Sequence, residues 1–116
     1  MVKIIMTTTN TGELIGKMLE PADLISYQDG AVVSRTIVFQ KSGTMTLFAF
    51  DAGEGLSEHT APFDAVLQVL EGEVEISIAG EQFHLEQGQM IIMPANRPHA
   101  LKALTKFKMI LTMIHA

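Results

Sequence analysis

From Ala31 to its end the sequence is a succession of short apolar runs rich in Val, Ile, Thr and Phe, separated mainly by glycines. Such runs are typical of β-strands. They recur about every eight to twelve residues, which is the spacing expected of an antiparallel sandwich or barrel. The expected strands are Val32–Gln40, Thr44–Ala52, Ala65–Leu70, Val74–Ala79, Gln82–Glu86, Gln89–Met93, His99–Leu104 and Phe107–Ile114. The sequence therefore predicts an all-β fold.

The first part of the chain has a different character. Residues 1–29 are mixed in composition and are expected to form a strand and turn segment. Pro21 is placed to begin a short helical turn that runs through Ile25, and this is the only helix that we predict. A chain of 116 residues suits one domain. We therefore expect a single domain over residues 1–116, with its strands over about 30–114.

The apolar pattern of the strands predicts how they are covered. Val74, Ile76 and Ile78 alternate with polar residues, as in a sheet with one wet face. Val32–Phe39 and Met109–Ile114 are apolar on both faces, so their outer faces need cover. A partner subunit would supply it, and so would the N-terminal segment Val2–Leu24. A homodimer that uses both kinds of cover is the leading interpretation.

Composition excludes several partners. Eight basic and thirteen acidic residues give a net charge of −5, and no Lys/Arg cluster is present, so we expect no nucleic-acid partner. The absence of cysteine excludes disulfides and thiolate metal sites. The apolar residues 1–6 are too few for a signal sequence or a membrane span. We therefore predict no membrane contact and a cytoplasmic location.

The chemistry is concentrated in few residues. The sequence has no phosphate-binding loop of the GxxxxGK type, no GxSxG and no HExxH. Of the four histidines, His59 and His99 each lie beside a turn at the end of an expected strand. His84 alternates with apolar neighbours and is expected at the surface. His115 lies next to the end of the sequence, where exposure is the default.

Two stretches carry a family resemblance. Residues 53–73, GEGLSEHTAPFDAVLQVLEGE, and residues 88–103, GQMIIMPANRPHALKA, resemble the two motifs of the cupin superfamily. Gly53, His59 and Gly72 match the first motif, G-x5-H-x-H-x3-E-x6-G. Gly88, Pro94 and His99 match the second, G-x5-P-x-G-x2-H-x3-N. The resemblance covers residues 30–114 and implies a double-stranded β-helix, or jelly-roll barrel, preceded here by a short N-terminal helical turn.

The departures from these motifs concern the metal ligands. The usual metal of the family is held by the two histidines and the glutamate of the first motif and the histidine of the second. His59 and His99 remain, whereas Ala61 and Ala65 stand in the other two places. Asp64 is one residue from the glutamate position, and alternation in a strand would turn it away from the interior. The resemblance thus implies either a weakly bound divalent ion (Zn, Fe, Mn or Ni) at the two histidines or a polar pair without metal.

The resemblance also implies a ligand pocket at one end of the barrel. His59 and His99 would face one another there, beside the space that Ala61 and Ala65 leave. Leu67 and Val69 share the parity of Ala65, and Arg97 either meets an anionic ligand at the rim or is solvated. The expected pocket residues are His59, Ala61, Ala65, Leu67, Val69, Arg97 and His99.

Three functions remain open at this stage. The first is a binding protein for a small, partly apolar metabolite, with a weakened two-histidine metal site. The second is a metal-dependent enzyme of the oxygenase, isomerase or lyase type. The third is a structural subunit whose barrel serves only dimerisation. The missing ligands disfavour the enzyme, and the fold does not choose among the three.

Overall fold

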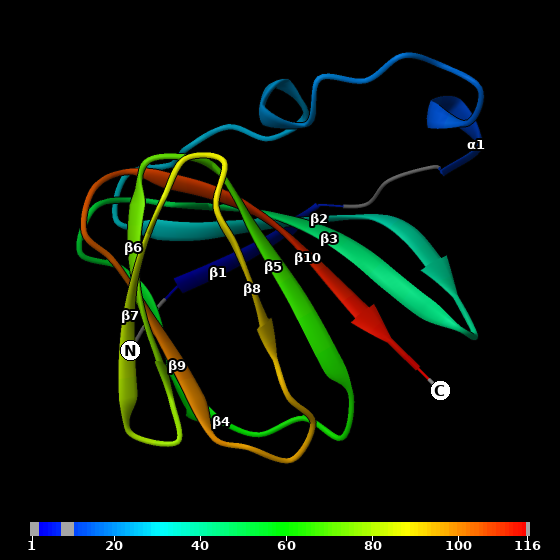
Figure 1. The fold of residues 1–116 in the computed structure, drawn as a ribbon. Helices are drawn as coiled ribbons and strands as arrows, with labels where there is room; N and C mark the ends of the chain where they lie inside the picture. The colour runs from blue at the N-terminus through cyan, green and yellow to red at the C-terminus, as the bar shows by residue number, and fades with distance from the viewer. Residues whose placement is uncertain (1–2, 8–10, 116) are drawn as a thin grey trace.

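The computed structural model describes residues 3–7 and 11–115, which form two β-sheets packed face to face with a short helical segment on one side (Figure 1). The six-stranded sheet has the order β1 (Lys3–Thr7), β2 (Ala31–Gln40), β3 (Gly43–Phe50), β10 (Phe107–Ile114), β5 (Asp64–Glu71) and β8 (Met90–Met93). The four-stranded sheet has the order β4 (Gly55–His59), β9 (His99–Ala103), β6 (Glu73–Ile78) and β7 (Glu81–Glu86). Apart from the parallel pair β1–β2, neighbouring strands are antiparallel. The all-β jelly-roll prediction is confirmed.

All eight predicted strands are present, with ends that shift by a few residues. The structure adds β1, which was expected only as part of a strand and turn segment, and β4, whose sequence GLSEH lacks apolar alternation. In β4 the backbone is placed by its partner strand. A Cβ at Gly55 would collide with the Leu101 carbonyl of β9, so only glycine permits this approach.

The predicted helical turn is the 3₁₀ helix η1 (Pro21–Leu24), which has proline in its first turn. Our expectation that it would be the only helix is wrong, because the four residues Thr11–Leu14 form the helix α1. No helix in residues 3–7 and 11–115 has the length and apolar character needed to cross a membrane.

The main core lies between the two sheets. Val74 and Ile76 of β6 face it, as their alternation predicted, and both are fully buried. At one end Phe50 of β3 packs against Phe107 of β10, with ring centroids 5.1 Å apart. Aromatic pairs at this separation stabilise a core beyond the area that they bury.

The N-terminal segment covers the outer face of the six-stranded sheet. Leu14 and Leu24 pack against the cluster of buried residues around Val33 and Leu47. Hydrogen bonds also tie the segment to the sheet, from Tyr27 to Glu71 and from Arg35 to the Leu24 carbonyl. Of the two covers considered for the apolar outer face, the structure shows this one for β2 and β3. Phe39, at the end of β2, remains 79% exposed.

Candidate functional site

His59 and His99 come together from two neighbouring strands. His59 is the last residue of β4, His99 is the first of β9, and the antiparallel pairing sets them directly opposite each other. The register between these strands shifts between Leu56 and His59, which marks a β-bulge or a similar irregularity. The two imidazole rings meet edge to face, with centroids 4.3 Å apart and planes inclined at 66°.

The backbone determines which ring nitrogens are available. Nδ1–H of His59 donates to the Ser57 carbonyl oxygen at 2.8 Å, and Nδ1–H of His99 donates to the Arg97 carbonyl oxygen at 3.3 Å. A carbonyl oxygen can only accept, so the proton of each neutral ring lies on Nδ1. Each Nε2 therefore carries a lone pair, which can accept a hydrogen bond or ligate a metal.

The two rings differ in their surroundings. His99 is 6% exposed, whereas His59 is open to solvent. Burial, and next the charge that His59 carries when protonated, lower the pKa of His99 below its ordinary value of 6.5, and the Arg97 carbonyl opposes this in part. His99 is therefore a neutral hydrogen-bond acceptor at neutral pH.

The apolar residues of the predicted pocket lie in the core. Ala65, Leu67 and Val69 all point inward from β5, with exposures of 3% or less, so the predicted parity is right. They belong to the cluster that packs between the sheets. Gln68 is exposed on the opposite face, as its parity requires.

The loops beside the histidines hold the remaining predicted residues. Ala61 lies between β4 and β5, and its carbonyl accepts the Asn96 N–H at 2.8 Å. Arg97 is exposed in the loop between β8 and β9. Asp64 points away from the interior, and its Oδ1 accepts the Ala95 N–H at 2.8 Å. Asn96 stands at the glycine position of the second motif with φ of 64°, a left-handed conformation that asparagine tolerates better than most residues.

A hollow of about 490 Å³, which we call the mouth hollow, adjoins this histidine pair. It lies between β4 and the inner face of β1, β2 and β3. Of the predicted pocket residues, His59 belongs to its lining. The lining residues are Ile4, Met6, Ser34, Thr36, Thr46, Phe48, Leu56, Ser57 and His59.

Sequence reasoning missed the hydroxyl side chains of this hollow. The signal was present, because Ser34 and Thr36 share the parity of the buried Val32 along β2. Polar residues at inward positions of a strand point to something other than a dry core. Their position around a hollow could not be read from one strand alone.

The histidine pair fits a metal only poorly. His59 and His99 offer two imidazole donors, and Ala61 and Ala65 offer none. In the described part of the chain, no group of three neighbouring ligand side chains includes either histidine. Stable zinc sites in proteins have three or four protein ligands, so this pair would hold a divalent ion weakly.

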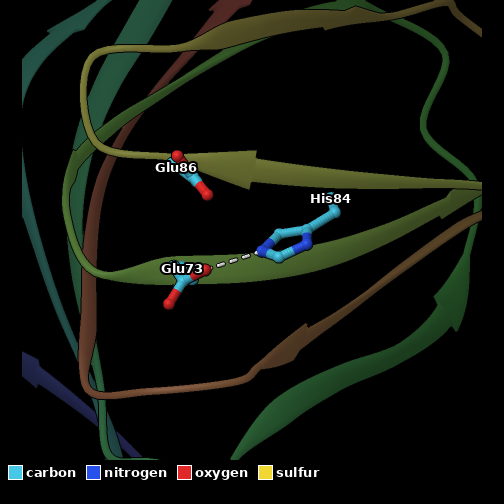
Figure 2. A group of neighbouring side chains, drawn as sticks. All are labelled: Glu73, His84 and Glu86. Carbon is cyan, nitrogen blue, oxygen red and sulfur yellow. Dashed lines mark hydrogen bonds and ion pairs between the residues drawn. The ribbon is translucent and has the colours of Figure 1, made fainter.

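A group that could hold a metal lies on the outer face of the other sheet. Figure 2 shows Glu73 of β6 with His84 and Glu86 of β7, and their ligand atoms all lie within 4.8 Å of one another. His84 Nε2 is 2.9 Å from Glu73 Oε1, in an ion pair whose side chains are 53% and 40% exposed. The predicted surface position of His84 is thus correct. Glu73 lies at the opposite end of β6 from Ile78, which pairs with His99.

A second hollow of about 470 Å³ lies under the N-terminal segment, on the outer side of the six-stranded sheet. Its lining includes Leu24, Ser26 and Tyr27 of the segment and Val33 and Arg35 of β2. Part of the hydrogen-bonding capacity of Arg35 is already used within the protein, because its guanidinium donates to the Leu24 carbonyl at 2.8 Å.

The family comparison agrees with this geometry. Residues 46–115 match the family model described as Cupin domain, a span that holds both motifs and the paired histidines. The chain belongs to the cupin family. A protein of unknown function from Streptococcus pyogenes is 34% identical, with a TM-score of 0.82 over 87% of this chain and 89% of that one.

Two further proteins are similar to this cupin. A cupin barrel protein from Leptotrichia buccalis is 39% identical, with a TM-score of 0.78 over 81% of this chain and 46% of that one. A pyrimidine/purine nucleoside phosphorylase of Geobacter sulfurreducens is 32% identical over 81 residues, which are 68% of this chain and 76% of that protein.

Proposed function

We propose that this cupin is a binding protein for a small, partly apolar molecule, held at the end of the barrel where His59 and His99 meet. The observation that carries the proposal is the orientation of the two rings. Each Nδ1–H donates to a backbone carbonyl, which leaves Nε2 of each ring as an acceptor; the ring centroids lie 4.3 Å apart, and His59 lines the mouth hollow. A few convergent polar groups beside apolar walls are typical of small-molecule sites.

The predicted pocket residues have defined roles in this proposal. In the proposal, Ala61 and Ala65 contribute small side chains beside the rings, and Leu67 and Val69, which pack in the core, contribute apolar surface. Arg97 is exposed in the loop between β8 and β9 and lies outside the lining of the mouth hollow, so of its two alternatives the proposal takes the solvated one.

A thermal-shift screen of a metabolite library tests the binding function. A ligand that binds only the folded state raises the melting temperature. We expect compounds that stabilise the natural protein but not His59→Ala, whereas His84→Ala, a matched change at a distant surface histidine, keeps the response. If the compounds that stabilise the protein act equally on all three, the site is elsewhere.

A divalent ion, Zn, Fe, Mn or Ni, would compete with the ligand for the Nε2 atoms of His59 and His99, and we propose that the two histidines bind it weakly. Two neutral imidazoles support it, and the absence of a neighbouring carboxylate limits its affinity. Competition with a chromogenic chelator measures this affinity. Tight stoichiometric binding that survives loss of both histidines would contradict the assignment.

An enzyme is the second candidate, and the relative from Geobacter sulfurreducens favours it. A nucleoside phosphorylase transfers the pentosyl group from a base to inorganic phosphate, which gives the free base and a pentose 1-phosphate. A metal-dependent oxygenase, isomerase or lyase is the other enzyme alternative, and the two missing metal ligands disfavour it. The lining of the mouth hollow contains no Lys or Arg to hold phosphate, which weighs against phosphorolysis there. Release of free base from uridine or inosine in phosphate buffer, followed by chromatography, decides this candidate.

The proposal for assembly is a homodimer of single-domain chains. Support comes from apolar side chains on the six-stranded sheet that remain exposed, among them Met6 and Phe39. Light scattering at micromolar concentration is expected to give twice 12.7 kDa, and a mass of 12.7 kDa would contradict the dimer. The cytoplasmic location stays a prediction, which subcellular fractionation tests.

A further inference from the structure

The inner face of β2 and β3 changes in character along the strands. Val32 is paired with Phe50 in the core, Ser34 with Phe48 at its edge, and Thr36 with Thr46 beyond it. Inward side chains thus pass from apolar to hydroxylic within three successive pairs. A core face needs no such hydroxyls, because a buried polar group costs free energy unless it is hydrogen-bonded.

The hydroxyls have the geometry of a binding wall. Thr36 Oγ1 and Thr46 Oγ1 are 3.1 Å apart and hydrogen-bonded to each other, and both line the mouth hollow. In such a pair one hydroxyl donates to the other, and the second retains a hydrogen to donate outward. The wall can therefore both donate to a ligand and accept from it.

The opposite wall of the hollow comes from β4, where the His59 ring can accept a hydrogen bond but not donate one to a ligand. His59 presents Nε2 because its Nδ1–H is held by the Ser57 carbonyl. Phe48 and Leu56 add apolar surface on the two sides of the hollow. A ligand between these walls meets hydroxyls on one side, an imidazole acceptor on the other, and carbon along its faces.

No Asp, Glu, Lys or Arg belongs to the lining of this hollow. The lining therefore offers a charged group no partner of opposite charge, and the part of a ligand that packs against Phe48 and Leu56 is expected to be uncharged. The hollow's volume of about 490 Å³ is in the usual range of small-molecule sites.

We infer that the mouth hollow takes an uncharged, hydroxylated ring compound, of the class that includes nucleosides and free sugars, and discriminates against their phosphate esters. This inference rests on the proposed binding function and specifies the ligand class of the same site. A hydroxyl or N–H of the ligand donates to Nε2 of His59. The hydroxyls of Thr36 and Thr46 bind groups on its other side.

Matched pairs of probes test the charge selection by isothermal titration calorimetry. The pairs are uridine with uridine 5′-monophosphate, inosine with inosine 5′-monophosphate, and glucose with glucose 6-phosphate. We expect at least one uncharged member to bind, and its ester to bind at least roughly tenfold more weakly. An ester that binds as well as its parent overturns the inference and leaves the binding function standing. Failure of all six probes overturns the inference, whereas the library screen above decides the binding function separately.

Variants locate the bound probe. Thr36→Val together with Thr46→Val removes both hydroxyls at nearly constant volume and is expected to weaken binding of the uncharged probe at least roughly tenfold. Thr112→Val, on β10 outside the mouth hollow, is the matched control and is expected to leave binding unchanged. Circular dichroism and melting curves establish that each variant is folded. Thr46→Ser, which keeps a hydroxyl, should retain binding if the double variant fails to fold.

A second copy of the chain is the competing occupant, because Ile4 and Met6 at the edge strand β1 are exposed beside the hollow. Met6→Lys distinguishes a small molecule from a second copy of the chain as the occupant of the mouth hollow. If this change splits a dimer and uncovers probe binding that the natural protein lacks, a partner subunit fills the hollow and the inference is wrong. Probe binding by the natural protein at its measured mass supports it.

Discussion

Gly72, one of the motif glycines, makes the sharpest test of how the barrel is held together. It joins β5 to β6 with φ of 82°, and a Cβ there would meet the Lys106 carbonyl oxygen and come within 2.9 Å of Phe107 Cα. Gly88, a glycine of the second motif, has a similar φ of 86° but no neighbouring atom within 4 Å of a Cβ. Alanine at both positions meets the same backbone strain, and only at Gly72 does it meet a steric conflict.

The magnitudes follow from this difference. Left-handed backbone costs a residue with a Cβ about 1–2 kcal/mol, so Gly88→Ala should lower the free energy of unfolding by that amount. Overpacking against backbone adds about 1–3 kcal/mol, which gives about 2–5 kcal/mol for Gly72→Ala. An unfolding entropy of about 2.1 cal/mol/K per residue over 116 residues converts these losses to about 4–8 °C and about 8–20 °C.

Differential scanning calorimetry of the natural protein and the two variants measures both shifts. If the slope of the free energy of unfolding against urea concentration is unchanged, the loss of stability arises in the native state and not from a change in the compactness of the denatured state. Equal losses of unfolding free energy at the two positions would refute the reasoning, because they would mean that a Cβ in the β5–β6 turn does not collide with the backbone of the turn before β10.

The other predictions concern His99, the N-terminal segment and the metal positions. The pKa of His99 is lowered in the folded state, so the unfolded chain binds this proton at a higher pH than the folded protein does. The free energy of unfolding should therefore fall as pH decreases from 6.5 through the folded pKa. Urea midpoints measured across that range should show this loss in the natural protein and not in His99→Gln. Tyr27 donates to Glu71 Oε1 at 2.6 Å, so Tyr27→Phe should lower the free energy of unfolding by about 1–2 kcal/mol, and an unchanged urea midpoint would mean that this contact does not hold the segment. Ala61→His with Ala65→Glu should tighten divalent-metal binding at least roughly tenfold in a chelator competition. Because Ala65 is 3% exposed, the metal-free double variant should also melt below the natural protein and recover when metal is added; no gain in affinity would mean that these positions do not face the histidines.

The way in which the N-terminal segment covers the six-stranded sheet depends on contacts between residues that are far apart in the sequence. Lys108 Nζ donates to the Ala22 carbonyl at 2.6 Å and lies 4.9 Å from the centroid of the Tyr27 ring. Burial, with the hydrogen bond to Glu71, raises the pKa of Tyr27. These contacts join residues up to 86 positions apart, and no local pattern specifies such pairs.

The strands were predictable because alternation and glycine spacing are local properties. β6 shows the agreement, since Val74 and Ile76 are buried and Glu75 between them is not. β4 could not be predicted, because its backbone follows β9 and its side chains show no period. A neighbour in space, not in sequence, determines such a strand.

The candidate site divides in the same way. The resemblance to the cupin motifs was sufficient to pair His59 with His99, whose ring centroids lie 4.3 Å apart. The mouth hollow beside them could not be predicted, because its lining, which includes Ser34 and Thr46, is assembled from separate strands only when the two sheets pack together. The choice of Nε2 as the acceptor depends on the Ser57 and Arg97 carbonyls, which are a property of the folded loops.

Nitrogen-detected NMR of the histidine rings tests the central claim most directly. In the free protein, His59 and His99 should both show the tautomer with the proton on Nδ1. During titration with a compound that stabilises the protein, the Nε2 signal of His59 should shift as it accepts a hydrogen bond, while the rings of His84 and His115 stay unchanged. The account is contradicted if bound compounds leave both rings at the barrel mouth unperturbed and instead shift signals of Ser26 and Arg35 in the hollow under the N-terminal segment.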